Sequence, residues 1–321
     1  CATWTFSGIY RSAVLFLGSS QGPPPRRLPP ASCDTMSGLL DQLPRVTLPS
    51  DWCHRPITLS FAPCSNLCLY MFGAAACLQR ASNFSAVQNQ FRYHGISSGA
   101  LVAAVLAVNA DVPVLFEKCM GLLDDLNIRR WGWVGAYSRT IRAIVQQAVK
   151  DRDVSEAFAP GKVRIGTTAF TPLPSLHEIT SCETGIVLEQ AILASCYIPV
   201  VWEDAIWLPD IGPCLDGGAS GFLVDGDIVF GPYHSNLPDV GPAEEYPRQL
   251  VFQPVDARDM LRLFEDGYRD CARWIQAGCP SRQAERHRLL TEQSCGGALT
   301  MLREGLATFL EVAGVRKKPR N

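Results

Sequence analysis

The chain has little net charge and no long uninterrupted hydrophobic run. Its 321 residues carry 29 Lys and Arg against 31 Asp and Glu, which gives a formal net charge of −2. So balanced a charge produces no strong field toward nucleic acid, and we expect no nucleic-acid partner. No stretch reaches the roughly 18 consecutive apolar residues that a membrane-spanning helix requires. With 47% hydrophobic residues, the composition is that of a globular protein.

The sequence also lacks paired Cys and His ligands with the spacing of a zinc site. It has 13 Cys, an odd number that does not suit a framework of disulfides. The closest pair, Cys64 and Cys68, is one helical turn apart and has no second Cys/His pair nearby. We therefore expect no metal, and we expect reduced thiols that pack as small apolar side chains in a cytoplasmic protein.

A change of composition near residue 56 divides the chain. Residues 19–50 include the Pro-rich run Gly22–Pro30, which favours extended backbone and predicts a linker. The expected organisation is a Pro-rich, disordered segment over 1–55 and a globular domain over 56–278. A helical extension with a basic tail is expected over 279–321.

Beyond this point, predicted strands alternate with predicted helices. The strands are expected over Ile57–Phe61, Gln90–His94, Val163–Phe170, Val200–Trp202, Ile206–Leu208 and Asp227–Phe230. The helices are expected over Asn66–Arg80, Ala100–Asn109, Val134–Lys150, Thr184–Cys196 and Ala257–Ala277. Such alternation predicts a three-layer α/β fold, with a mostly parallel central sheet and helices on both faces.

The motif Gly95-Ile96-Ser97-Ser98-Gly99 lies between a predicted strand and an Ala/Val/Leu-rich helix. A serine on a tight strand-to-helix turn points its hydroxyl away from the backbone, and Gly95 and Gly99 let neighbouring chains approach closely. The positive N-terminus of the helix then faces any anion that develops there. Ser97 is therefore a candidate nucleophile. The alternative is an ordinary Gly/Ser turn before a buried helix.

A serine nucleophile needs a base, and the sequence offers two arrangements. Asp216, followed by Gly217 and Gly218, suits a tight turn at a strand end with a carboxylate that accepts the proton, although the same letters fit an ordinary Asp-Gly turn. The chain order of the elbow serine, Asp216 and then His234 or His287 would instead suit the triad of an α/β-hydrolase. Neither histidine lies in a Gly-rich or small-residue turn of obvious purpose, so a surface position is the favoured interpretation of each.

Five blocks, in order along the chain, resemble the patatin-like phospholipases and, within them, the adiponutrin-type lipid hydrolases. The blocks are Leu59–Ala62 with Leu69–Gly73, then Gly95–Leu101, Ala191–Pro199, Leu215–Gly218 and Gly267–Asp270. The resemblance identifies residues 56–278 as a patatin-like domain with that family's three-layer fold.

The resemblance implies ester hydrolysis by a Ser–Asp dyad, with no catalytic histidine and no cofactor. Ser97 would attack the ester, and Asp216 would take its proton and later activate water. Backbone N–H groups of Cys64, Ser65 and Asn66 would hold the oxyanion. The implied substrate is a glycerolipid, which a peripheral protein would reach at a membrane or lipid-droplet surface.

The chain departs from the family at the loop that holds the oxyanion. Pro63, Ser65 and Cys68 stand where the family carries glycines, which permit positive φ and close approach of N–H groups. Pro63 has no N–H, and losing one such donor costs about 10²–10³ in rate. A catalytically impaired lipid-binding or scaffold protein on the same fold is therefore the alternative. The segment Trp131-Gly132-Trp133 is a candidate for lipid contact or for packing between helices.

Overall fold

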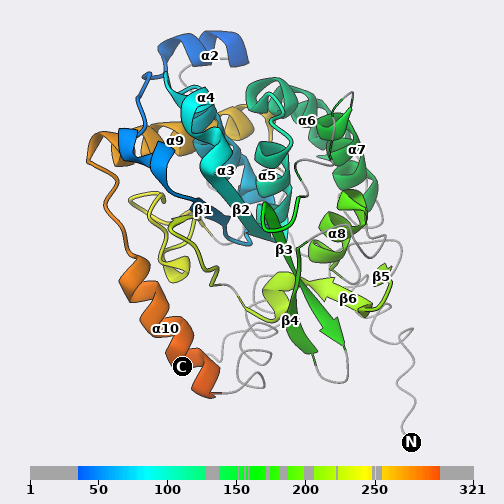
Figure 1. The fold of residues 1–321 in the computed structure, drawn as a ribbon. Helices are drawn as coiled ribbons and strands as arrows, with labels where there is room; N and C mark the ends of the chain where they lie inside the picture. Colours follow the sequence, from blue (N-terminus) through cyan, green and yellow to red (C-terminus); the bar gives the residue numbers. More distant parts are fainter. Residues whose placement is uncertain are drawn as a thin grey trace, which may run out of the picture.

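The structure, a computed structural model, describes residues 35–127, 137–150, 152, 154, 157, 159–170, 174–180, 187–198, 206–221, 223–247, 250 and 255–296. These residues form an α/β fold around one mixed sheet (Figure 1). The strands are β1 (Ile57–Phe61), β2 (Phe91–Ile96), β3 (Val163–Phe170), β4 (Pro174–Ile179), β5 (Ile206–Leu208), β6 (Gly212–Asp216) and β7 (Ile228–Phe230). The α/β class predicted from the sequence is confirmed.

The centre of the sheet is parallel, and its edge beyond β3 is antiparallel. β7, β1, β2 and β3 pair side by side in parallel, as buried strands joined by helical crossovers do. β4 and β6 both pair with β3 in the antiparallel sense, and β5 pairs with β6 in the same way. The antiparallel edge was not predicted from the sequence.

Two strands share one edge of β3. β4 pairs antiparallel with six residues of β3, overlapping the positions that pair with β2 and with β6, and so takes up the other edge. On the shared edge, β2 pairs as far as Gly166, and β6 pairs from Thr167 onward. β2 and β6 therefore lie end to end along β3. This arrangement brings Ser97, the residue after β2, next to Asp216 at the end of β6.

The helices pack against and around this sheet. They are α2 (Met36–Gln42), α3 (Cys68–Gln79), α4 (Phe84–Val87), α5 (Ser98–Ala107), α6 (Val112–Asn127), α7 (Tyr137–Val149), α8 (Leu188–Ser195), α9 (Ala257–Gln276) and α10 (Gln283–Gly296). Short 3-10 turns include η1 (Ser50–His54), η2 (Ser65–Leu67), η4 (Gly217–Ala219) and η5 (His234–Asn236). No helix among the described residues is both long and apolar enough to cross a bilayer.

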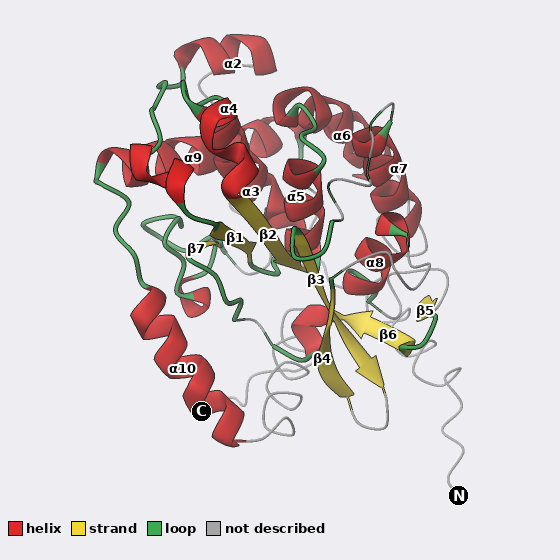
Figure 2. Cartoon of the chain, in the orientation of Figure 1, coloured by secondary structure: helices red, strands yellow, loops and turns green. Residues whose placement is uncertain are grey.

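Helices α3 and α9 cross at very short range. A Cβ at Gly73 of α3 would lie 1.9 Å from the carbonyl oxygen of Phe264, and one at Gly267 of α9 would lie 1.8 Å from that of Tyr70. Any larger residue at either position would push the two backbones apart. This contact fixes α9 over α3 in the layer that Figure 2 shows on the same side of the sheet as α5 and α6.

Helix α10 lies apart from this layer, next to the loop that precedes β7 (Figure 2). Its buried Arg286 forms a 2.7 Å ion pair with the equally buried Asp239 and donates to the carbonyl oxygen of Gly226. The loop in turn covers the far face of the sheet, where the Ser60 hydroxyl donates to the carbonyl oxygen of Asp225 at 2.5 Å. The helical part of the extension predicted after residue 278 is present, and its basic tail lies outside the described residues.

Residues from Thr35 onward belong to the folded body. The Thr35 hydroxyl accepts a backbone N–H in the first turn of α2, and Leu39 and Leu48 are buried in the main hydrophobic core. Trp52 packs against Phe91 of β2 with a ring-centroid distance of 6.0 Å. The disordered segment predicted over 1–55 therefore does not include residues 35–55, because apolar side chains in this stretch pack into the core.

Several predicted elements coincide with observed ones. The strands predicted over Ile57–Phe61, Val163–Phe170 and Ile206–Leu208 are β1, β3 and β5, and the helix predicted over Ala257–Ala277 is α9. The predicted strand Val200–Trp202 and the tryptophan segment 131–133 lie outside the described residues.

Candidate active site

Ser97 lies in the sharp turn between β2 and α5. Its backbone has φ 55° and ψ −132°, a conformation that residues other than glycine rarely adopt and that costs about 1–3 kcal/mol. A Cβ at Gly95 would lie 2.4 Å from the carbonyl oxygen of Gly99, and one at Gly99 would lie 2.2 Å from that of Phe61. Both glycines of the motif are therefore required by close backbone contacts, and the predicted strand–turn–helix geometry is present.

Asp216 ends β6 with its carboxylate facing the hydroxyl of Ser97. Ser97 Oγ donates a hydrogen bond to Asp216 Oδ2 at 2.6 Å, and Asp216 Oδ1 accepts from the backbone N–H of Gly218 at 2.8 Å. A Cβ at Gly217 would lie 2.4 Å from the carbonyl oxygen of Gly166. The Asp-Gly-Gly turn thus holds a carboxylate beside the serine, and the two side chains are called the Ser97–Asp216 pair below.

The backbone of Asp216 is held from two sides. Its carbonyl oxygen accepts a 2.8 Å hydrogen bond from the hydroxyl of Thr168 on β3, and that hydroxyl accepts one from Ser220. Its N–H donates to the carbonyl oxygen of Tyr197 at 2.7 Å. Sequence patterns gave no indication of these braces, since they join segments that are distant along the chain.

Burial raises the pKa of Asp216 from 3.8 to about 7. The hydroxyl of Ser97 and the N–H of Gly218 favour the charged form and lower the pKa, but desolvation outweighs them. A pKa near neutrality suits a general base, because the group can both accept and return a proton near pH 7. Burial also raises the pKa values of the neighbouring thiols of Cys64 and Cys196, which therefore stay neutral.

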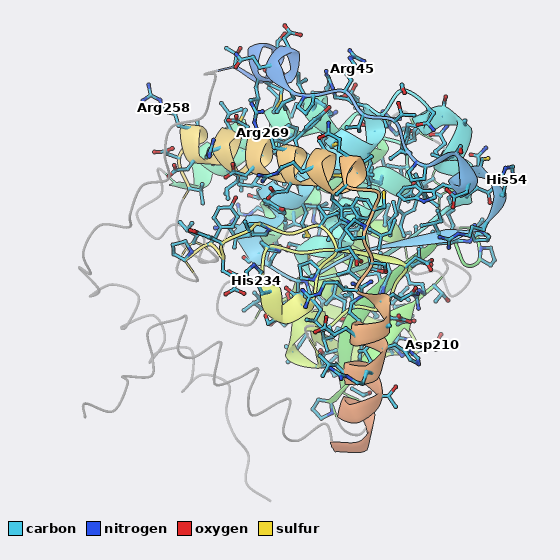
Figure 3. All side chains as sticks on the ribbon, turned by 90° about the vertical axis from the view of Figure 1, so that its left-hand side faces the viewer. Arg45, His54, Asp210, His234, Arg258 and Arg269 are labelled. Carbon is cyan, nitrogen blue, oxygen red and sulfur yellow. The ribbon has the colours of Figure 1, made fainter. Side chains whose placement is uncertain are left out.

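The two histidines of the alternative triad lie elsewhere. His234 is exposed in η5, with Nε2 2.9 Å from the carbonyl oxygen of Pro242, and His287 is exposed on α10. Figure 3 shows His54 and His234 at opposite outer parts of the molecule. No hydrogen bond in the described part of the chain joins a histidine to the Ser97–Asp216 pair. The Ser-His-Asp arrangement is therefore not the one that the structure contains.

The loop between β1 and α3 passes beside the Ser97–Asp216 pair. The N–H of Cys64 donates to the hydroxyl of Ser98 at 3.3 Å, and Pro63 lies against Gly218. Cys64, Ser65 and Asn66, the residues predicted to hold an oxyanion, are all buried here. The structure thus brings this loop next to Ser98 and Gly218, the neighbours of the Ser97–Asp216 pair.

The three glycine replacements in this loop differ in their consequences. Ser65 has φ 49°, so it takes the left-handed conformation that a glycine would adopt without strain. Cys68 has φ −58°, which any residue adopts. Pro63 removes a backbone donor. The path of the loop is therefore compatible with the replacements, and the loss that remains is one N–H.

Within the described ranges, no three or more His, Cys, Asp or Glu side chains are arranged to hold a metal ion. Nine cysteines whose side chains the structure describes are free thiols, and seven of these nine are buried.

Comparisons with known proteins place the chain in a family. The family model of the patatin-like phospholipases matches residues 59–227, a segment that includes both Ser97 and Asp216. A chain in the crystal structure of full-length SpcU in complex with full-length ExoU, from the type III secretion system of Pseudomonas aeruginosa, is 15% identical, with a TM-score of 0.32. That match covers 69% of the present chain and 53% of the other, so the present chain spans about half of that protein's length. A search of curated proteins finds no match. Because the family model covers more than half of the sequence, this chain belongs to the patatin-like phospholipases.

Proposed function

We propose that this protein is a serine lipid acyl hydrolase that cleaves carboxylic esters of glycerolipids through the Ser97–Asp216 pair. The observation that carries the proposal is the 2.6 Å hydrogen bond between these side chains at a strained strand–turn–helix elbow. Membership of the patatin-like phospholipases supports lipid esters as the substrate class.

In the first half-reaction, Asp216 takes the hydroxyl proton of Ser97 as Ser97 Oγ attacks the ester carbonyl. The resulting oxyanion lies near the N-terminal end of α5 and the backbone of Cys64, Ser65 and Asn66, where positive partial charge is available. The intermediate collapses to an acyl-serine, and the departing alcohol takes the proton from Asp216.

In the second half-reaction, water replaces the alcohol. Asp216 accepts a proton from the water as its oxygen attacks the acyl-serine, and Ser97 recovers that proton when the fatty acid leaves. The raised pKa of Asp216 suits this exchange, because its carboxylate must bind and release a proton in each half-reaction.

A catalytically impaired lipid-binding protein remains the second candidate. It is favoured by Pro63, which has no N–H, and by Cys64, whose N–H is already directed to the hydroxyl of Ser98. For Cys64 to hold an oxyanion, its N–H must exchange that hydroxyl for the substrate.

A fluorophosphonate that reacts with activated serines separates the two candidates. We expect wild-type protein to be labelled, Ser97→Ala to lose the label, and Ser60→Ala to keep it. Ser60 is a matched control, since it is also a buried serine and its hydroxyl donates to the carbonyl oxygen of Asp225 on the far face of the sheet. Well-folded wild-type protein that takes no label would favour the impaired protein.

A lipid surface is the proposed partner, and the antiparallel edge of the sheet is its proposed contact. Trp207 on β5 is 73% exposed and pairs with Pro213 of β6, the strand that ends at Asp216, and Leu176 on β4 is 40% exposed and pairs with Thr168 of β3. Tryptophan favours the boundary between lipid and water. We expect Trp207→Ala to reduce flotation with phospholipid vesicles. Val114→Ala, which removes an exposed apolar side chain from α6, should leave flotation unchanged.

A further inference from the structure

The C-terminal end of α8 contacts the Ser97–Asp216 pair, although the proposed chemistry gives it no role. Ser195 is the last residue of α8 and is fully buried. Its hydroxyl accepts a hydrogen bond from the backbone N–H of Ser97 at 2.8 Å and donates one to the carbonyl oxygen of Gly166 at 2.6 Å. Because an N–H only donates and a carbonyl only accepts, the direction of both bonds is fixed.

The residues around Ser195 contact the other half of the pair. The hydroxyl of Thr167, which is the β3 partner of Asp216, donates to the carbonyl oxygen of Ala194 at 3.1 Å. Two residues after Ser195, the carbonyl oxygen of Tyr197 accepts the N–H of Asp216. One short segment therefore contacts the elbow, β3 and the end of β6.

The elbow needs an acceptor at this point. The N–H groups at the start of a helix have no partner within that helix, and Ser97 is the N-cap of α5. Ser97 also follows the last β2–β3 pair, in which Ile96 lies opposite Gly166. The N–H of Ser97 therefore has no place in the hydrogen bonding within α5 or between β2 and β3. The hydroxyl of Ser195 accepts it instead.

The second bond of Ser195 connects the elbow to the aspartate turn. The carbonyl oxygen of Gly166 lies at the junction where β6 follows β2 along β3, and Gly217 packs directly against it. A single hydroxyl group therefore bridges the backbone of the nucleophile and the β3 atom against which the aspartate turn rests.

We propose that Ser195 is a positioning residue that holds the backbone of Ser97 at the distance from which its hydroxyl reaches Asp216. The role rests on the proposed function, since it assumes that Ser97 is the nucleophile. Ser195 acts through Ser97 and touches no reacting atom.

A positioning role differs measurably from a structural one. A structural serine, when replaced, lowers the amount of folded protein but leaves each folded molecule with normal kinetics. If Ser195 positions Ser97, its loss lowers kcat and leaves KM unchanged. The acidic limb of the pH profile also moves to higher pH, because the hydrogen bond from Ser97 lowers the pKa of Asp216.

The experiment compares Ser195→Ala, Ser195→Cys and the control Ser60→Ala with wild type, using p-nitrophenyl butyrate and a fluorophosphonate. Per folded molecule, we expect Ser195→Ala to lose about 10²-fold in kcat, the effect of displacing a reacting group by about 1 Å. Ser195→Cys retains a weak donor of similar size and should fall between Ser195→Ala and wild type, and it serves if the alanine variant does not fold. Ser60→Ala should match wild type.

The outcomes separate this inference from the proposed function. Active wild type with equal kcat and pH profile in Ser195→Ala and Ser60→Ala would overturn the role of Ser195 and leave the function intact. Folded wild-type protein that takes no label would overturn the proposed function. Hydrogen exchange of the Ser97 amide would then test whether Ser195 holds that amide. Faster exchange in Ser195→Ala than in Ser60→Ala supports the contact, and equal exchange refutes it.

Discussion

Replacing Asp216 by asparagine is expected to stabilise the folded protein at pH 8 while removing its activity. The carboxyl group is surrounded by protein, and its pKa is about 7 instead of 3.8. Above pH 7 the folded chain must therefore hold a poorly solvated charge. Asparagine has nearly the same shape without the charge, and its amide oxygen can still accept the N–H of Gly218.

The size of the effect follows from these two pKa values. Their difference corresponds to roughly 4 kcal/mol of folding free energy. Because the pKa of Asp216 is raised in the folded state, its contribution to stability is fully present below about pH 4 and is lost as the pH rises through about 7. The asparagine variant does not titrate there. Its stability relative to wild type should therefore increase by roughly 4 kcal/mol between pH 4 and pH 8.

Urea unfolding followed by tryptophan fluorescence, at several pH values between 4 and 8, measures this difference. Fluorophosphonate labelling at the same pH values reports the loss of the base. Asp210→Asn is the control, since Asp210 is exposed in the turn between β5 and β6 (Figure 3). Parallel stability curves for Asp216→Asn and wild type from pH 5 to pH 8 would refute the reasoning.

Four further substitutions test other conclusions about the site. Ser65→Gly should raise the free energy of unfolding by about 1 kcal/mol, because it relieves a positive φ; a loss of stability would mean that the side chain matters more than the strain. Gly99→Ala should cost about 3 kcal/mol or prevent folding, as seen by thermal unfolding, since its Cβ would meet backbone atoms of Phe61; an unchanged Tm would contradict this close approach. His234→Ala and His287→Ala should leave fluorophosphonate labelling unchanged, and loss of labelling in either would restore the triad.

The Ser97–Asp216 pair could be located from the sequence because each residue lies in a local pattern. Gly95 and Gly99 around a serine, between a strand and a helix, specify the elbow by steric requirements that the structure contains. Asp216 before two glycines specifies a turn in the same way. The strands at the centre of the sheet were also predictable, since buried parallel strands are short apolar runs.

The parts that could not be predicted depend on contacts between distant segments. β4 lacks an apolar pattern because most of its side chains are exposed, so no periodicity marks it. Ser195 lies in an apolar helix, and nothing local shows that its hydroxyl reaches Ser97. The fold of residues 35–55 was missed because proline content suggested a linker, whereas Leu39 and Trp52 pack into the core.

The end-to-end placement of β2 and β6 makes the chemistry depend on strand register. Side chains alternate between the faces of a sheet, so sliding β6 by one residue along β3 would turn the carboxylate of Asp216 to the opposite face. Insertions in the 119-residue interval from Ser97 to Asp216 can therefore preserve the pair only where they leave that alignment intact. A single residue added inside β6 would separate the carboxylate of Asp216 from the hydroxyl of Ser97, although neither side chain had been changed.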